Sequence, residues 1–127
     1  MSRRRRDAFD SSVHESDLWL DSMMRHLGTE DRRVAWVALR ATLHAVRDEF
    51  EPRHAVRVGN RLPTPLRGLY YEDWETETVH EGDGRSPAFL ARLENNIPGD
   101  SGIIPEVAAR ATAAVMRERL TPLRPGN

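Results

Sequence analysis

His44 and Asp48 are the residues whose types and spacing come closest to a metal site. Four residues apart on a helix, an imidazole and a carboxylate lie on the same face, and both are metal ligands. Glu49 follows directly, but one helix supplies at most two or three ligands here, and the Glu-x-x-His motif of helical-bundle metal sites is absent. A hydrogen bond made by His44 at the edge of the core is the favoured interpretation.

His14 is the third weak candidate for metal binding, with Glu15 and Asp17 close by in the sequence. It can join His44 only if the two helices that carry them pack antiparallel in the right register. The remaining histidines have no serine or acid placed as in a catalytic triad. We therefore assign no catalytic residue, cofactor or metal ligand, and keep metal binding as an alternative.

Residues 72–85 form an acidic segment with glycines at Gly82 and Gly84, which predict a loop. Six carboxylates and His80 lie between Glu72 and Asp83, and hard cations bind several carboxylate oxygens. The spacing does not fit an EF-hand, so a solvated loop is the favoured interpretation.

Aromatic side chains gather just before this loop. Tyr70, Tyr71 and Trp74 follow Arg67, and aromatic residues and arginine are enriched in protein interfaces. They are equally what a short helix needs to cover a bundle core, which is the commoner role. Both interpretations stay open at this point.

Composition limits the class of protein. The chain has 127 residues, of which 39% are hydrophobic and 31% charged, and these fractions suit a helical bundle with broad solvated faces. The absence of cysteine excludes disulfides, zinc fingers and thiol catalysis. All 19 basic residues are arginine, so chemistry that needs a lysine amine is also excluded. The net charge of −1 makes nucleic acid an unlikely partner, and the longest apolar run, Val34 to Leu39, predicts no membrane span.

The N-terminus carries the run Arg3 to Arg6, followed by acidic and polar residues in place of the apolar stretch of a signal peptide. We predict a cytoplasmic protein with a disordered arginine-rich tail at residues 1–8. Contact of this tail with nucleic acid is a further alternative.

Helical spacing of apolar residues and capping signals predict six helices in one domain, residues 9–127. The first starts at Ser11 or Ser12, where Ser12 and Glu15 form a capping box, and ends at Gly28. Trp36, Leu39 and Leu43 then belong to a 3-4 apolar stripe. The six predicted ranges are 11–28, 29–50, 52–62, 64–71, 86–97 and 105–120. No segment alternates as a strand does, so the predicted fold is all-α.

An internal repeat follows when the chain is aligned with itself. Arg40-Ala41-Thr42 recurs 70 residues later as Arg110-Ala111-Thr112. The first repeat spans residues 9–74 and the second, residues 86–124, lacks counterparts of the third and fourth helices. An incomplete copy leaves apolar surface uncovered, which predicts a dimer. The predicted interface residues are Leu66, Tyr70, Tyr71, Trp74, Val107, Val115 and Leu120.

The segments Leu39–Asp48, Leu62-Pro63 and Arg67–Trp74 resemble the bacterial domain of unknown function 2267. The resemblance spans about Phe9 to Leu120 and is most specific over Arg67–Trp74. It implies an all-helical, internally duplicated domain, and it brings no activity, cofactor or catalytic residue. Members of that family continue through a second Leu-Pro and a short helix, which this sequence lacks.

Together these observations predict a non-enzymatic interaction or scaffold protein that works as a homo-oligomer, with an unidentified protein partner as a further possibility. A metal-binding helical bundle and a nucleic-acid-binding accessory protein remain as alternatives.

Overall fold

Six α-helices make up the structure, a computed structural model that describes residues 2–76 and 87–120. No strand occurs within these two ranges, so the predicted all-α fold is confirmed. The helices are α1 (Ser2–Leu27), α2 (Arg32–Glu49), α3 (Pro52–Gly59), α4 (Thr64–Tyr70), α5 (Pro87–Asn96) and α6 (Pro105–Leu120).

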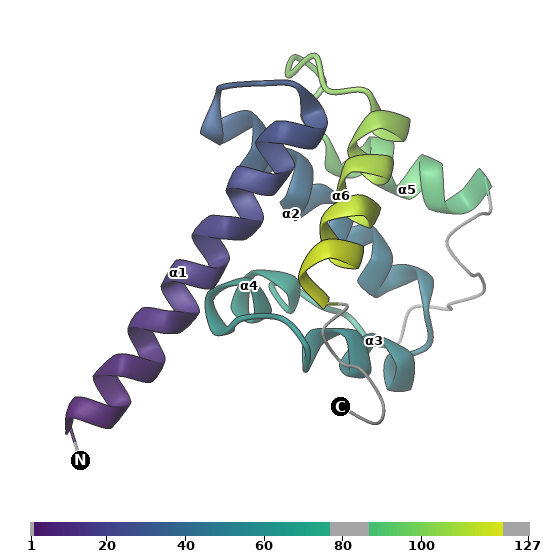
Figure 1. Ribbon diagram of the computed structural model, residues 1–127. Helices are drawn as coiled ribbons and strands as arrows, with labels where there is room; N and C mark the ends of the chain where they lie inside the picture. The colour runs from purple at the N-terminus through teal and green to yellow at the C-terminus, as the bar shows by residue number, and fades with distance from the viewer. Residues whose placement is uncertain (1, 77–86, 121–127) are drawn as a thin grey trace.

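Helix α2 is the centre of the bundle, because each of the other five helices contacts it (Figure 1). Its small side chains, Ala35, Ala38, Ala41 and Ala45, are all buried and allow the neighbouring helices to approach closely. Helix α6 lies across the C-terminal half of α1 and also contacts α2 and α5. The largest buried side chains around this crossing include Trp19, Met23 and Val115.

The turn between α1 and α2 follows the local sequence. Gly28 has a φ of +71°, and the amides of Gly28 and Thr29 donate to the carbonyls of Arg25 and Met24 at 3.3 and 3.0 Å. This is the Schellman arrangement, in which a glycine adopts the left-handed conformation at little cost, as predicted for Gly28. The carboxylate of Asp31 then accepts from the amide of Arg33 at 2.9 Å and caps α2, so the helix begins at Arg32 and Thr29 is not its cap.

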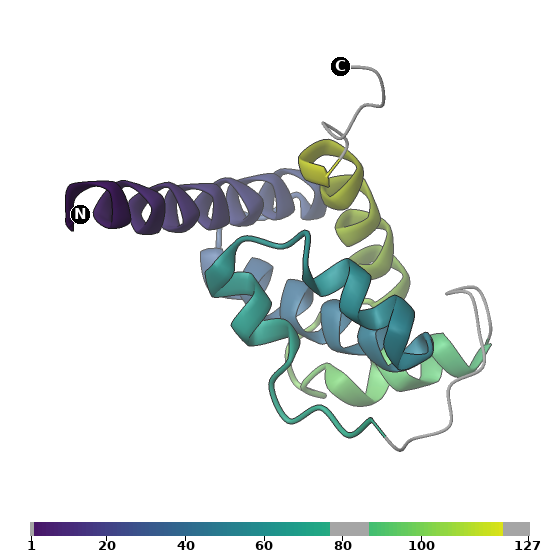
Figure 2. The same cartoon turned by 90° about the horizontal axis from the view of Figure 1, so that it is seen from below.

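Helix α1 differs from the prediction at its start. It begins at Ser2 and not at Ser11 or Ser12, so that the predicted disordered tail forms its first turns. The N-terminal half of α1 extends away from the other helices, as two perpendicular views show (Figures 1 and 2). We call residues 2–14 of this helix the α1 arm, which touches the start of α4 through Ser12.

Trp36 was predicted in the buried stripe of α2, but 39% of it is exposed. Leu39 and Leu43 of the same stripe are fully buried, as predicted. The buried face of α2 is rotated toward its alanines, because α5 and α6 pack closely against these small residues.

Candidate functional site

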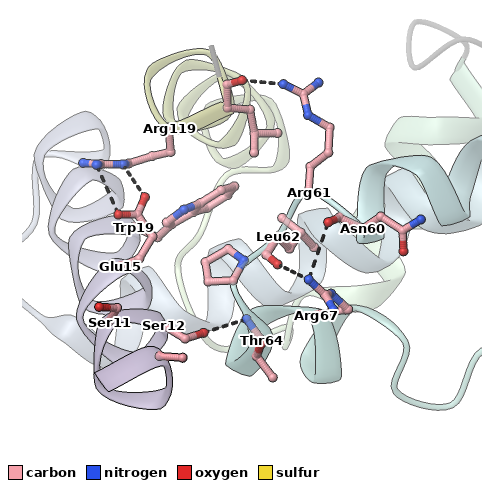
Figure 3. A pocket seen from close by; sticks show the side chains of 13 residues that line it. Ser11, Ser12, Glu15, Trp19, Asn60, Arg61, Leu62, Thr64, Arg67 and Arg119 are labelled. Atoms are coloured by element: carbon pink, nitrogen blue, oxygen red, sulfur yellow. Dashed lines mark hydrogen bonds and ion pairs between the residues drawn. The ribbon is translucent and has the colours of Figure 1, made fainter. Parts of the chain in front are cut away.

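A cleft of about 490 Å³ lies where α1, the turn between α3 and α4, and the end of α6 meet (Figure 3). Trp19 and Leu62 contribute apolar surface, and three guanidinium groups and one carboxylate line the walls. The charged residues are Glu15, Arg61, Arg67 and Arg119. Among the described residues that line the cleft none is a histidine, so its serine and threonine hydroxyls have no imidazole as general base there.

Glu15 and Ser12, the predicted capping box of α1, make contacts with other helices. The Glu15 carboxylate accepts from Arg119 of α6 at 3.0 and 3.4 Å. The Ser12 hydroxyl accepts from the backbone amide of Thr64 at 2.9 Å, where α4 begins. Glu15 therefore connects α1 to α6, and Ser12 connects α1 to α4 (Figure 3). Neither residue caps α1, which begins ten residues before Ser12, at Ser2.

Arg61 and Arg67 bind backbone carbonyls at the ends of helices. Arg67 donates to the carbonyls of Gly59 and Leu62 at 3.1 and 3.0 Å, which close the turn after α3. Arg61 donates to the carbonyl of Leu120 in the last turn of α6. Carbonyls at helix C-termini lack intrahelical partners, so guanidinium donors stabilise them.

A second polar cluster holds the C-terminus of α4 against α2. Arg47 is 5% exposed and donates to the carbonyls of Tyr70 and Glu72 at 3.0 and 2.6 Å. Its guanidinium also forms a bidentate pair with Asp48 at 2.8 and 3.0 Å. The Tyr70 hydroxyl donates to the carbonyl of Ala55 at 2.7 Å and connects α4 to α3, and burial raises its pKa.

His44 belongs to the same cluster. Its Nε2 lies 2.7 Å from the carbonyl of Leu69 and 3.9 Å from the carboxylate of Glu72. Burial lowers the pKa of His44 below the usual 6.5, although the bond to Leu69 opposes this shift. The neutral imidazole donates to that carbonyl, which is the hydrogen-bonding role favoured from the sequence.

The predicted metal ligands do not form a site. Asp48 is paired with Arg47, His44 binds a carbonyl, and His14 is exposed on the α1 arm. Within the two described ranges, no three side chains among histidine, aspartate and glutamate are placed to hold a metal ion. Most of the acidic segment, including His80, lies outside the described residues; Glu72 itself pairs with Arg40 at 2.9 Å.

The predicted interface residues separate into two groups. Leu66, Tyr70 and Val115 are at most 1% exposed and are covered by the chain's own helices, so they offer a partner no surface. The other four are half-buried, namely Tyr71, Trp74, Val107 and Leu120. Tyr71 packs between Tyr70 and Trp74, with ring centroids at 5.0 and 5.3 Å.

The most exposed large apolar side chain lies on the α1 arm. Phe9 is 65% exposed and Val13, one turn later, is 38% exposed. The sequence prediction placed Phe9 beyond the start of the helix and Val13 on its buried face. The sequence does contain a pattern that places these two side chains. Residues 9, 13, 16, 20, 23 and 27 repeat at alternating spacings of four and three, so the stripe that packs against the other helices continues into the α1 arm.

A smaller apolar hollow of about 210 Å³ lies between the α1–α2 and α5–α6 turns. Leu27, Val34 and Val107 line it, and Ile104 at its edge is 58% exposed. Val107 therefore borders this hollow, as Leu120, another predicted interface residue, borders the cleft beside α1.

Comparison with known proteins assigns the chain to a family. Residues 16–125 match the family described as "Uncharacterized conserved protein (DUF2267)". The chain belongs to this family, whose match covers most of its length. No curated protein matches the chain. None of the helices in the described part of the chain is long and apolar enough to span a membrane.

Proposed function

We propose that this protein is a non-enzymatic interaction protein that pairs with a second copy of itself through the α1 arm. The observation that carries the proposal is the position of Phe9, which is 65% exposed on the continuation of the buried stripe of α1. Exposed apolar side chains aligned with a core-facing stripe are typical of helices that pack on a partner.

The stripe changes environment along the helix. Leu20 and Met23 are at most 9% exposed because α2 and α6 cover them. Phe9 and Val13 occupy equivalent positions of the same 4-3 repeat, but they are 65% and 38% exposed, since the arm extends away from the body (Figure 2). A second arm would cover both residues by the knobs-into-holes packing that this repeat supports.

The charges of the arm favour an antiparallel pair. Four arginines at positions 3–6 precede Asp7 and Asp10, which are exposed and make no ion pair with the described side chains. A parallel pair would bring the two arginine runs together, whereas an antiparallel pair places them at opposite ends of the contact. This charge arrangement favours a second copy over an unrelated apolar partner.

The contact is short, which limits its strength. A helical segment of about 13 residues is about 20 Å long, and two such segments bury less than the roughly 1,200 Å² of a standard interface. We therefore expect a dimer that dissociates within an accessible concentration range, and not an obligate one.

Sedimentation equilibrium over a concentration series tests this proposal. The wild-type chain is expected to rise from its monomer mass of 14.5 kDa toward twice that value. Phe9→Ser combined with Val13→Ser is expected to stay monomeric, because both contact side chains become polar. Ile104→Ser, which removes another exposed apolar side chain, is the matched control and should dimerise like the wild type. A wild-type chain that stays monomeric at every concentration would refute the proposal.

The internal duplication is a second part of the proposal. Helices α1 and α2, and likewise α5 and α6, are successive helices in contact, and at the offset of 70 residues Leu20 and Met23 correspond to Leu90 and Leu93. These similarities support a common origin of the two pairs. The proposal predicts that the backbones of residues 20–50 and 90–120 superpose with the same crossing of their helices.

A further inference from the structure

Charge is unevenly distributed along this chain. Residues 52–71, which contain α3 and α4, include four arginines and no aspartate or glutamate. The whole chain has 19 basic and 20 acidic residues. A net charge near zero therefore hides a segment with four positive charges.

The positive charges of α3 lie on an exposed row. Arg53 and Arg57 are four residues apart, Arg61 follows after another four, and all three are exposed. Four residues of α-helix advance about 6 Å, so Arg53 and Arg57 are separated by about that distance along α3. Arg61 follows in the turn two residues after the helix ends at Gly59. We call Arg53, Arg57 and Arg61 the arginine row.

The row is free of acidic partners in the described part of the chain. Neither Arg53 nor Arg57 has an ion pair with any described residue, and Arg61 uses one nitrogen to bind the carbonyl of Leu120. Arg40 and Arg119, in contrast, are each paired with a glutamate. Uncompensated guanidinium groups on one face produce a local positive potential that attracts anions.

The row leads into the cleft beside α1. Arg61 lines that cleft together with Arg119, so the positive surface continues from the face of α3 to the cleft (Figure 3). The one carboxylate among the lining residues described, Glu15, is neutralised by Arg119. Arg67 also lines the cleft, but its bonds to the carbonyls of Gly59 and Leu62 give it a structural role.

We propose that the arginine row binds the phosphate backbone of a nucleic acid. The separation of about 6 Å between Arg53 and Arg57 is close to twice the about 3.4 Å rise per phosphate of one strand, so these two arginines can face every second phosphate. Guanidinium groups bind phosphate oxygens in bidentate geometry. An exposed row without an enclosing pocket suits an extended chain of charges better than one small anion.

The proposed contact depends neither on the base sequence of the nucleic acid nor on pairing through the α1 arm. Phosphate contacts position a protein on nucleic acid without specifying bases. Three contacts give a slope of log affinity against log salt of about −3 on duplex DNA and about −2 on a single strand. Since α3 is not part of the arm, a failure of the dimer proposal leaves this one unaffected.

Fluorescence anisotropy with labelled single-stranded DNA, duplex DNA and RNA of equal length, in low salt and then in increasing salt, tests the proposal. The wild-type chain is expected to bind at least one of these probes with the slope given above. Arg53→Gln with Arg57→Gln is expected to weaken binding at least about tenfold and to reduce the slope by about 1.8 on duplex DNA or about 1.4 on a single strand. Neither side chain has a described bond, so the fold should be retained, which circular dichroism verifies.

Arg33→Gln with Arg110→Gln is the matched control, because it removes two exposed charges elsewhere. It should change affinity far less than the variant of the row. Four outcomes would overturn the proposal: no wild-type binding even in low salt, equal losses in the two double variants, complete loss on changing Arg3–Arg6 to serine, or equal competition by polyglutamate. The last would mean that the row recognises carboxylates of an acidic protein.

Discussion

Gly59 is the residue at which α3 closely approaches two tyrosines at the C-terminal end of α4, Tyr70 and Tyr71. A Cβ atom at this position would lie 2.3 Å from the hydroxyl oxygen of Tyr71 and 2.9 Å from the buried ring of Tyr70. Because Tyr70 is fully buried and its hydroxyl is hydrogen-bonded to the carbonyl of Ala55, its ring has little room to move. A glycine is therefore required here for space.

Gly59→Ala is expected to lower the free energy of unfolding by about 1–3 kcal/mol, because the added methyl overpacks this contact. Gly68→Ala is the matched control, since α4 leaves open space around Gly68. That substitution should stabilise the protein by about 0.5–1 kcal/mol, as alanine has the higher helix propensity. Urea unfolding of both variants measures the difference, and equal effects would contradict the close approach.

Arg47 is the buried charge on which the junction of α2 and α4 depends. Arg47→Met would leave the carboxylate of Asp48 and the carbonyls of Tyr70 and Glu72 without this donor. Removal of one partner from a buried charge pair costs about 3–5 kcal/mol.

Arg40→Met, at the exposed pair with Glu72, should cost at most about 1 kcal/mol. Chemical denaturation of the two methionine variants compares them directly. Similar losses would show that Arg47 is not specially coupled to the end of α4.

At the scale of elements, one carboxylate of α6 contacts three side chains of α1. Glu118 of α6 accepts from Ser22 at 2.5 Å and lies 2.7 Å from His26, both on α1, and Arg25 is 3.0 Å away. The hydrogen bonds from Ser22 and His26 and the charge of Arg25 lower the pKa of Glu118 from 4.5 to about 2. Folding therefore favours the ionised form.

The lowered pKa of Glu118 determines the direction in which stability changes with pH. The stabilisation by Glu118 is present above about pH 4.5 and is lost as the pH falls toward 2. Glu118→Gln should be less stable than the wild type at neutral pH and should lose less stability between these two pH values. Thermal unfolding between pH 4.5 and pH 2 measures this loss of stability, with Glu94→Gln at an exposed position of α5 as control. An unchanged acid profile in Glu118→Gln would contradict the assignment.

The local signals in the sequence predict the elements well. Pro52 and Pro105 mark the first residues of α3 and α6, and Gly28 ends α1 as expected, because these features depend on neighbouring residues. Contacts between helices are harder to predict from the sequence. Ser12 and Glu15 match a capping box, but they bind α4 and α6, and no local pattern distinguishes the two uses.

The candidate sites depend on the arrangement of helices even more strongly. Leu66 and Tyr70 belong to a pattern that fits an interface or a core, and only the packing of α4 decides for the core. The arginine row lies within a segment visible in the sequence, but the net charge of the whole chain conceals it. Its exposure follows from the position of α3 at the edge of the bundle.

At the scale of the whole molecule, the structure has a packed body and an uncovered arm. A helix of 12 residues in water is marginally stable by itself, so the arm depends on the packed half of α1 for its nucleus and should fray toward its N-terminus. Pairing with a second arm would suppress that fraying. The arm should therefore respond to protein concentration, while the body should not.

Amide hydrogen exchange of residues 7–14, measured at protein concentrations below and above the dimer midpoint, tests the central claim most directly. The account predicts slow exchange of these amides in concentrated samples and fast exchange in dilute ones. Amides of α2 serve as an internal reference and should be equally protected in both. Fast exchange of the arm at every concentration, beside a protected α2, would show that the arm is not a contact surface.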